Sequence, residues 1–392
     1  MYLRDYLPVT DLSENKKPLH FPQLDALRFM AAFMVVFVHA YENWINWFGI
    51  PHPLASSADP KSYSWFGQHL SRLIGNFNFG VDMFFLISGF LITYLLLKEK
   101  KEAGKINIRN FFIRRILRIW PLYFFVIALS PLLVWWMGWP APEYKPVIFF
   151  YNNFRTIATE RWDFPFAHFW SICVEEHFYL VWPFLVAFVP MKKLPFAFLS
   201  VMAISITYRY YAHDNPNVTW YSVYLNTISR IDALALGGLA AWIHFHRPFA
   251  LRMPVGVRLL LYAGLLWALS TDDLGSWPNS FELVWKKYFY LLLAGLMMMN
   301  YVFNPEAKLR WGPNHPINYL GRCCFGIYLW GNILLQILLH KLILVHVPSG
   351  NGWIYWPLIL GVSLLVPVIS YQLIEKPFMK LKSRFAIVKT RV

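Results

Sequence analysis

Residues 79–96 read FGVDMFFLISGFLITYLL, and this apolar run decides the fold class of the chain. It carries a single charged residue, Asp82, near its start, and its length approaches the roughly 20 residues that cross a hydrocarbon core of about 30 Å. Inside such a core the backbone must satisfy its own hydrogen bonds, which an α-helix does and an open strand does not. The run therefore predicts a transmembrane helix.

Other apolar segments of similar length lie on both sides of this run, so we expect an all-α, polytopic bundle of about ten spans. The composition agrees, because 57% of the residues are hydrophobic and 15% are charged, whereas soluble domains carry about 25% charge. Aromatic residues make up 19% of the chain, as expected where many helix ends lie at a lipid–water boundary. The expected spans are 24–47, 79–97, 120–139, 168–189, 194–212, 220–244, 256–272, 284–303, 317–346 and 353–376.

The distribution of basic residues predicts the orientation of the bundle. The chain has 36 Lys and Arg and a formal net charge of +15, and these residues concentrate between the apolar runs, above all in 98–118 and 376–391. A basic excess marks the cytoplasmic side, so we expect both termini in the cytoplasm. The loops 48–78 and 140–167, kept irregular by their prolines, are then outside. The same pattern favours membrane lipids over nucleic acid as partners.

The domain organisation is simple. The polar lead does not resemble a cleavable signal peptide, so we expect a cytoplasmic N-terminal tail at 1–20. One transmembrane domain follows at 21–378, and a cytoplasmic C-terminal tail at 379–392. Within the domain, 105–119 alternates apolar residues with Arg, which predicts an amphipathic surface helix that runs into the third span.

The cysteines give no sign of disulfides or of a bound metal. Cys173, Cys323 and Cys324 all lie in apolar runs, where free cysteine behaves as a small buried hydrophobe. No Cys/His cluster has the spacing of zinc ligands. We therefore expect core thiols and no metal.

Charged residues inside spans are costly and are usually functional or paired. Arg28 and His39 are eleven positions apart in the first span, which puts both on one helix face about 16 Å apart along the axis. They predict a polar channel in which His39 takes a proton from a hydroxyl as general base. The alternatives are two side chains that snorkel to opposite headgroup regions and, for His39, a satisfied core histidine.

Arg114, Arg115 and Arg118 form a basic face on the amphipathic segment. Arg115 and Arg118 are i,i+3 neighbours and can contact one anion together, and the planar guanidinium suits bidentate phosphate contact. Coenzyme A carries phosphates, and so do lipids. The face is therefore a candidate donor site, with a lipid-binding cluster as the alternative.

Glu175 and Glu176 lie a turn or two inside the fourth span, near the depth expected for His39. Adjacent helical residues point about 100° apart, so we expect one carboxylate to face a shared cavity. The other would contact a neighbouring helix, with Arg230 as a candidate partner. The alternative is exposure of both at the interface. Asp82 fits a capping role at a helix N-terminus.

Seven stretches of the chain together resemble the acyltransferase 3 family of integral membrane O-acyltransferases, and they occur in the order typical of that family. They are FPQLDALRFMAAFMVVFVHA at 21–40, FGVDMFFLISGFLITYLL at 79–96, RRILRIWPLYF at 114–124, FWSICVEEHFYLVWPF at 169–184, RIDALALGGLAA at 230–241, GRCCFGIYLWGNILL at 321–335 and YQLIEKPF at 371–378.

The motifs of that family match residues already singled out. Its Arg-x10-His motif corresponds to Arg28 and His39, and its Arg-x-x-Arg motif to Arg115 and Arg118. Its Trp-Ser-x-x-x-Glu-Glu motif begins at Trp170 and includes both glutamates. The expected site comprises catalytic Arg28, His39, Glu175 and Glu176, donor-binding Arg114, Arg115 and Arg118, and substrate-binding Asp82, Trp170 and Ser171.

The resemblance implies transfer of an acyl group, with acetyl expected, from cytosolic acetyl-CoA or another acyl-CoA. The implied acceptor is a hydroxyl of an extracytoplasmic or cell-surface glycan or lipid-linked sugar, and the implied location is the bacterial inner membrane. Family members also acylate macrolides, so a small molecule is an alternative acceptor. The SGNH esterase-like domain of many members is not expected here. A secondary transporter is the alternative from another class, but the related halves typical of transporters are not visible.

Overall fold

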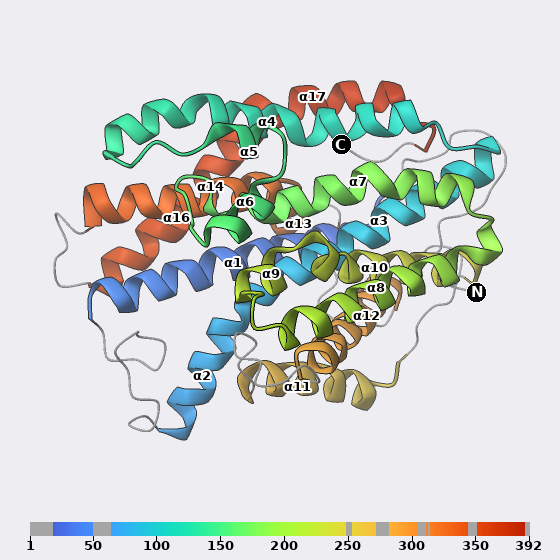
Figure 1. Cartoon of the computed structure of the whole chain (residues 1–392), viewed down its shortest axis with the longest axis horizontal. Helices are drawn as coiled ribbons and strands as arrows, with labels where there is room; N and C mark the ends of the chain where they lie inside the picture. Colours follow the sequence, from blue (N-terminus) through green and yellow to red (C-terminus); the bar gives the residue numbers. More distant parts are fainter. Residues whose placement is uncertain are drawn as a thin grey trace.

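The computed structural model describes residues 19–49, 64–247, 253–271, 282–304, 311–312, 314–343 and 351–388, and within these ranges it contains helices and no strand (Figure 1). The all-α prediction is therefore confirmed. The α-helices are α1 (Pro22–Trp47), α2 (Trp65–Gly75), α3 (Gly80–Ala103), α4 (Ile108–Met137), α5 (Tyr144–Ile148), α6 (Asn152–Thr159), α7 (Trp170–Phe188), α8 (Leu194–Asp214), α9 (Trp220–Leu225), α10 (Thr227–His246), α11 (Val255–Thr271), α12 (Lys287–Phe303), α13 (Pro316–Arg322), α14 (Cys324–Leu338), α16 (Gly352–Ser370) and α17 (Lys376–Lys382).

Six helical stretches in the described ranges are long and apolar enough to cross a membrane, and each overlaps a predicted span. Helices α8, α10, α11 and α12 occupy the other four predicted segments without meeting the same requirement. Two of them, α11 and α12, have 17 residues each, and α10 contains Arg230 and Asp232. The six stretches are Pro22–Trp47, Trp65–Ala103, Ile108–Met137, Ala167–Phe188, Cys324–Ile343 and Gly352–Phe385.

The prediction of irregular loops at 48–78 and 140–167 was wrong in part, because short helices form in both. Ser64 begins α2 by accepting a hydrogen bond from the backbone N–H of Gly67 at 3.2 Å. In the second loop, Pro146 lies in the first turn of α5, a position where proline is tolerated. Residues 50–63 of the first loop lie outside the described ranges.

The amphipathic segment and the third predicted span form one continuous helix, α4, which passes through Pro121 and Pro131. Asn107 starts this helix by accepting a hydrogen bond from the backbone N–H of Asn110 at 3.0 Å. Gly104, with a φ of 71°, ends the preceding α3 in the left-handed region that glycine readily adopts. The chain reverses direction at this turn, and the basic residues follow it in the first turns of α4.

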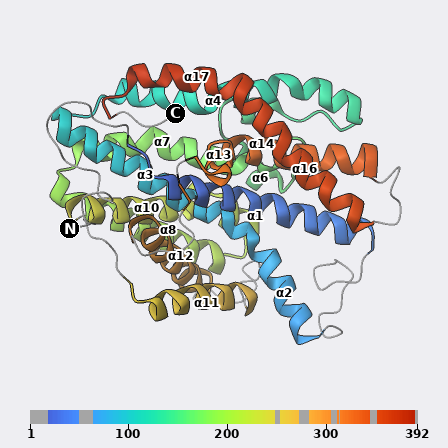
Figure 2. The same ribbon diagram turned by 180° about the vertical axis from the view of Figure 1, so that it is seen from behind.

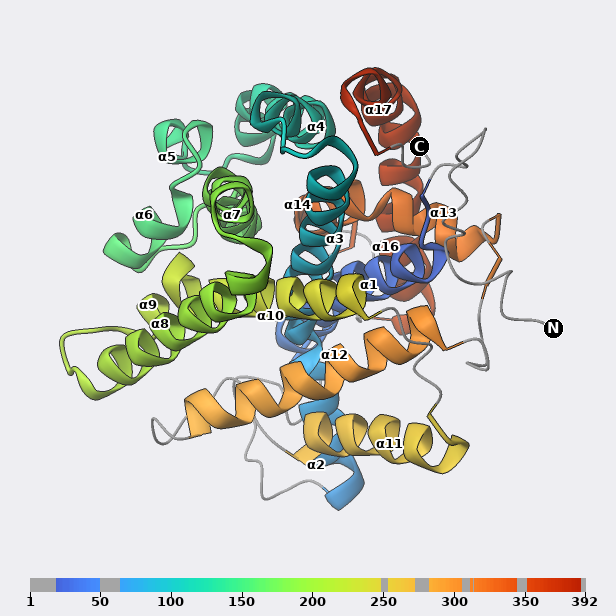
Figure 3. The same cartoon turned by 90° about the vertical axis from the view of Figure 1, so that its right-hand side faces the viewer.

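Helix α3 lies near the centre of the bundle, as Figure 3 shows, and it packs against α1, α7, α10 and α12. Two glycines permit the closest of these approaches. A Cβ atom at Gly89 would overlap the carbonyl oxygen of Leu234, and one at Gly237 would overlap that of Leu86. Small residues at helix interfaces let membrane helices pack backbone to backbone. The two glycines therefore fix where α3 and α10 lie along each other.

The chain closes with α16 and α17, which return across the bundle to the start of α4. Helix α17 packs alongside α4, as Figures 1 and 2 show from opposite sides. The short 3₁₀ turn Ser383–Phe385 follows it. Part of the predicted C-terminal tail is thus a helix docked on the basic face of α4.

Candidate functional site

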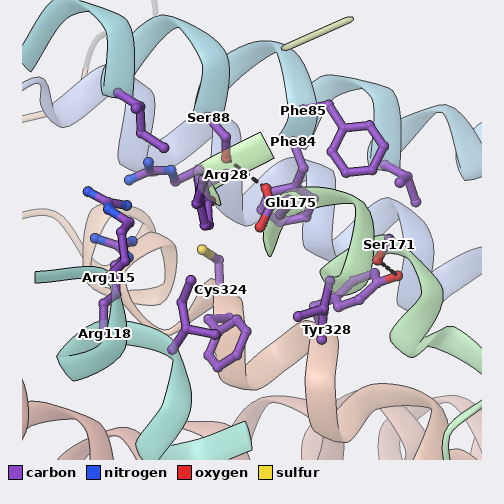
Figure 4. A pocket seen from close by; sticks show the side chains of 16 residues that line it. Arg28, Phe84, Phe85, Ser88, Arg115, Arg118, Ser171, Glu175, Cys324 and Tyr328 are labelled. Carbon is purple, nitrogen blue, oxygen red and sulfur yellow. Dashed lines mark hydrogen bonds between the residues drawn. The ribbon is translucent and has the colours of Figure 1, made fainter. Parts of the chain in front are cut away.

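A pocket opens between α1, α3, α4, α7 and α14, and it holds about 680 Å³ of empty space including its mouth. Apolar side chains such as Phe84 and Phe85 form part of its wall (Figure 4). Its polar lining residues are Arg28, Ser88, Arg115, Arg118, Ser171, Glu175, Tyr179, Cys324 and Tyr328. Five of the ten residues that the sequence predicted for the site therefore meet in one cavity.

One end of the pocket is cationic. The guanidinium groups of Arg28, Arg115 and Arg118 gather there, from α1 and α4 (Figure 4). Arg28 has a weak ion pair, at 3.7 Å, with Asp25. Within the part of the chain that the structure describes, Arg115 and Arg118 form no ion pair with a carboxylate. This end is suited to a ligand that brings its own negative charge.

Arg115 is held by aromatic rings rather than by an acid. Its guanidinium lies 5.7 Å from the ring centre of Phe111 and 5.5 Å from that of Tyr179. Such cation–π contacts stabilise the side chain. They leave its hydrogen-bond donors available for an anion, and its Nε has no hydrogen-bond partner among the described residues.

Arg114 turns away from this pocket, so only two of the three predicted donor-binding arginines line it. Its Nη2 donates to Glu99 at 2.8 Å, and its Nη1 donates to the carbonyl oxygen of Phe385 at 2.8 Å. Because neighbouring helical residues project about 100° apart, Arg114 and Arg115 face different surroundings.

The two adjacent glutamates also diverge, as the helical geometry predicted. Glu175 lines the pocket and accepts a hydrogen bond of 2.9 Å from the hydroxyl of Ser88 on α3. Glu176 does not line it and lies within interaction range of Trp120 on α4. The suggested contact with Arg230 is absent, because that arginine pairs with Asp82 at 3.3 Å.

The end of the pocket away from the arginines carries hydroxyl groups. The hydroxyls of Ser171 and Tyr328 are 2.6 Å apart, and Tyr328 also donates to the carbonyl oxygen of His168 at 3.1 Å. The ring Nε2 of His168 lies 2.8 Å from the carbonyl oxygen of Leu329. Since a carbonyl only accepts, Nε2 carries the proton. The other ring nitrogen, Nδ1, is a buried acceptor with no hydrogen-bond partner in the described ranges.

His39, the predicted general base, does not line the pocket. It is on the same unbroken helix as Arg28, but its side chain is 34% exposed and its Nδ1 lies 3.5 Å from the Glu42 carboxylate. His168 is within electrostatic reach of His39. The structure thus brings the predicted Arg28 into the cavity and leaves the role of His39 as a prediction.

Asp82 and Trp170 belong to a buried charge network outside the pocket. Asp82 pairs with Arg230 at 3.3 Å and with Lys287 at 3.7 Å. Lys287 also pairs with Asp232 at 3.3 Å, and Asp232 lies 2.6 Å from Arg209. The ring of Trp170 lies 5.4 Å from the guanidinium of Arg230. Asp82 lies in the first turn of α3, where it was expected to cap the helix. Its carboxylate also neutralises the buried cations Arg230 and Lys287, and removal of one partner from a buried ion pair is strongly destabilising.

Four polar lining residues were missed from the sequence: Ser88, Tyr179, Cys324 and Tyr328. Tyr179 follows Glu175 by four positions, so helix periodicity could have placed both on one face. Cys324 was expected to be a core thiol, and it is buried but also lines the pocket. Within the described ranges, no group of three or more His, Cys, Asp or Glu side chains could hold a metal ion.

Comparison with known proteins identifies the family. A putative O-acetyltransferase from Staphylococcus aureus (strain COL) is 25% identical over 397 residues, which cover 94% of this chain and 59% of the relative. The O-acetyltransferase OatA from S. aureus (strain NCTC 8325 / PS 47) is 25% identical over 402 residues with the same coverage. The chain thus spans 59% of the length of these relatives, and no solved structure matches it. Because the acyltransferase domain family matches residues 21–372, this integral membrane chain belongs to the acyltransferase 3 family.

Proposed function

We propose that the protein transfers an acetyl group from cytosolic acetyl-CoA to a hydroxyl of an extracytoplasmic or cell-surface glycan. The observation that carries this proposal is the polarity of the pocket. Three arginines line one end, and paired hydroxyls line the other. This asymmetry suits a donor with a polyanionic head and a neutral thioester tail. The names of the two S. aureus relatives support O-acetyl transfer.

The proposed location is a bacterial inner membrane, which the chain would cross about ten times. Both termini and the start of α4 would lie on its cytoplasmic side. Arg28, Arg115 and Arg118 would then lie near the side from which coenzyme A arrives. Their guanidinium groups would bind its phosphates and admit the pantetheine arm. The acceptor, a glycan or lipid-linked sugar, would approach from the opposite side, near Ser171, Trp170 and Asp82.

The chemistry requires a base that acts on the acceptor hydroxyl. The acceptor hydroxyl attacks the thioester carbonyl carbon, a C–O bond forms, the C–S bond breaks and the coenzyme A thiolate leaves. A base removes the hydroxyl proton, and the thiolate is finally protonated to the free thiol. We propose His39 as that base and Glu175 as the group that orients the acceptor or the base. Glu176 would support Glu175 from the side of α4.

Mass spectrometry of surface glycans tests the proposal directly. A strain that lacks the protein should lose one class of O-acetyl groups, and the wild-type chain should restore it, whereas the double variant Arg115→Ala/Arg118→Ala should not. Purified protein in vesicles should incorporate label from acetyl-CoA into the same glycan. Unchanged glycan acetylation in the deletion strain would refute a glycan acceptor and would favour a small-molecule alcohol such as a macrolide.

A further inference from the structure

A second cavity adjoins the cationic end of the pocket. It holds about 430 Å³ of empty space including its mouth, and its lining includes Glu99, Arg114, Arg115 and Lys382. Arg115 lines both cavities, so the two meet at this side chain. Groups in either cavity can therefore contact Arg115.

Lys382 is the unusual member of this lining. It is the last residue of α17, and it is only 7% exposed. The charged groups with the largest effect on it are all cations, namely Arg118, Arg115, Arg28 and Arg114. In the part of the chain that the structure describes, its ammonium has no ion pair and no hydrogen bond. A buried cation among cations is costly unless a negative group compensates it.

The nearby carboxylates already have other partners. Glu99 binds Arg114 at 2.8 Å, Asp25 lies 2.8 Å from His20, and Glu175 accepts from Ser88. Glu375 is within electrostatic reach of Arg118 and is not among the groups with the largest effect on Lys382. Among the described residues these carboxylates are therefore already engaged, which leaves the space beside Lys382 open to the anion of a bound ligand.

Contacts with α4 hold the backbone around Lys382 in place. Helix α17 packs against α4, and Arg114 donates to the carbonyl oxygen of Phe385, three residues after the lysine. This arrangement holds the ammonium close to the arginines before any ligand arrives. Preformed charge of this kind binds an anion without the cost of ordering a flexible tail.

We propose that Lys382 binds the phosphates of the acyl-CoA donor, together with Arg115 and Arg118. The second cavity takes phosphate beside Lys382 and Arg115, and the first takes phosphate beside Arg118, followed by the pantetheine arm and the thioester. This inference rests on the proposed function and adds a donor-binding residue from the C-terminal segment. A phosphate could equally belong to a lipid headgroup. We commit to coenzyme A because the second cavity meets the one that would hold the thioester.

The test compares Lys382→Met with Lys380→Met, an exposed position on the same helix, in neutral-lipid vesicles. Donor dependence is measured with acetyl-CoA and with S-acetylpantetheine, which lacks the phosphates. Lys382→Met should raise the KM for acetyl-CoA about ten- to hundredfold, the value of a charge-assisted hydrogen bond. It should leave the KM for S-acetylpantetheine unchanged. Lys380→Met should change neither value, and Lys382→Arg should restore most of the acetyl-CoA affinity.

Equal loss with both donors would show a structural role for Lys382 and overturn the inference, as would no loss with either. A defect seen only in anionic-lipid vesicles would assign the lysine to a lipid headgroup. Thermal stabilisation of the purified protein by coenzyme A separates the two proposals. A wild-type protein that coenzyme A does not stabilise contradicts the donor itself, whereas equal stabilisation of wild type and Lys382→Met contradicts only the role of the lysine.

Discussion

The hydroxyl of Ser88 on α3 donates a 2.9 Å hydrogen bond to Oε1 of Glu175 on α7, midway between the cationic and hydroxyl-lined ends of the pocket (Figure 4). This contact helps to fix the direction of the carboxylate, which also interacts with Tyr179 and with the nearby guanidinium groups of Arg28 and Arg118. It also ties two helices that bring together residues from distant parts of the sequence. Its removal should therefore affect the reaction more than the fold.

Ser88→Ala should lower kcat about tenfold or more, because a hydrogen bond to a charged group contributes about 1.5–3 kcal/mol. The KM for acetyl-CoA should change little, since the phosphates bind elsewhere. The measurement is acetyl transfer in vesicles, normalised to folded protein. Ser200→Ala, on the exposed face of α8, is the matched control. Equal kcat values for both variants would argue against a role for the Ser88–Glu175 contact.

Arg115→Ala and Arg118→Ala should each raise the donor KM about ten- to hundredfold, because each removes a charge-assisted contact with phosphate. Arg109→Ala, an exposed arginine on the same helix, should leave it unchanged. Donor-concentration curves in vesicles provide the measurement. If the double variant keeps the wild-type curve, the cluster binds lipid instead of the donor.

His39→Ala should reduce turnover about 10²–10⁴-fold, the usual contribution of a positioned base, and His39→Gln should not rescue it. Glutamine can hydrogen-bond but cannot accept the proton. A structural role predicts the opposite, with near-normal turnover in His39→Gln. His246→Gln, at an exposed site of α10, controls for general effects of the exchange.

His168→Gln provides the competing test, because the structure leaves Nδ1 of this histidine as an unpaired buried acceptor. If His39 is the base, His168→Gln should retain measurable turnover with an unchanged donor KM. Loss of turnover in His168→Gln together with normal turnover in His39→Gln would transfer the role to His168.

Asp232→Asn should destabilise the folded protein by about 3–5 kcal/mol, because it removes the carboxylate partner of buried Arg209 and one of the two partners of Lys287. The expected result is a clearly lower Tm of the detergent-solubilised protein. Asp214→Asn, at the exposed end of α8, should leave Tm unchanged. A wild-type Tm for Asp232→Asn would mean that the network contributes little to stability.

Cysteine labelling tests the proposed orientation. A cysteine at Arg161, an exposed position in the 140–167 loop, should react with an impermeant reagent from outside intact cells. A cysteine at Lys105, exposed before α4, should react only in inverted vesicles. The three native cysteines are buried and should give little background. Outside labelling at position 105 would contradict the orientation.

The sequence predicted the helical class and the charged residues within spans, because bilayer thickness and the cost of buried charge act on local sequence. Arg28 and Glu175 were found in this way. The pairing of Asp82 with Lys287 could not be found, since helix periodicity shows which residues share a face but not which helix that face meets. Lys382 was missed for the same reason: nothing in its local sequence distinguishes it from the exposed Lys380.

Any Cβ atom at Gly89 would overlap the backbone of α10, and this overlap limits which substitutions the position can accept during evolution. Gly89 follows Ser88 directly, so a larger residue at 89 would push α3 outward and carry the Ser88 hydroxyl away from Glu175. Helix packing and reaction geometry are therefore inherited together at this position. Changes that adapt the enzyme to a new acceptor are expected at the walls of the pocket, while the contact between α3 and α10 persists.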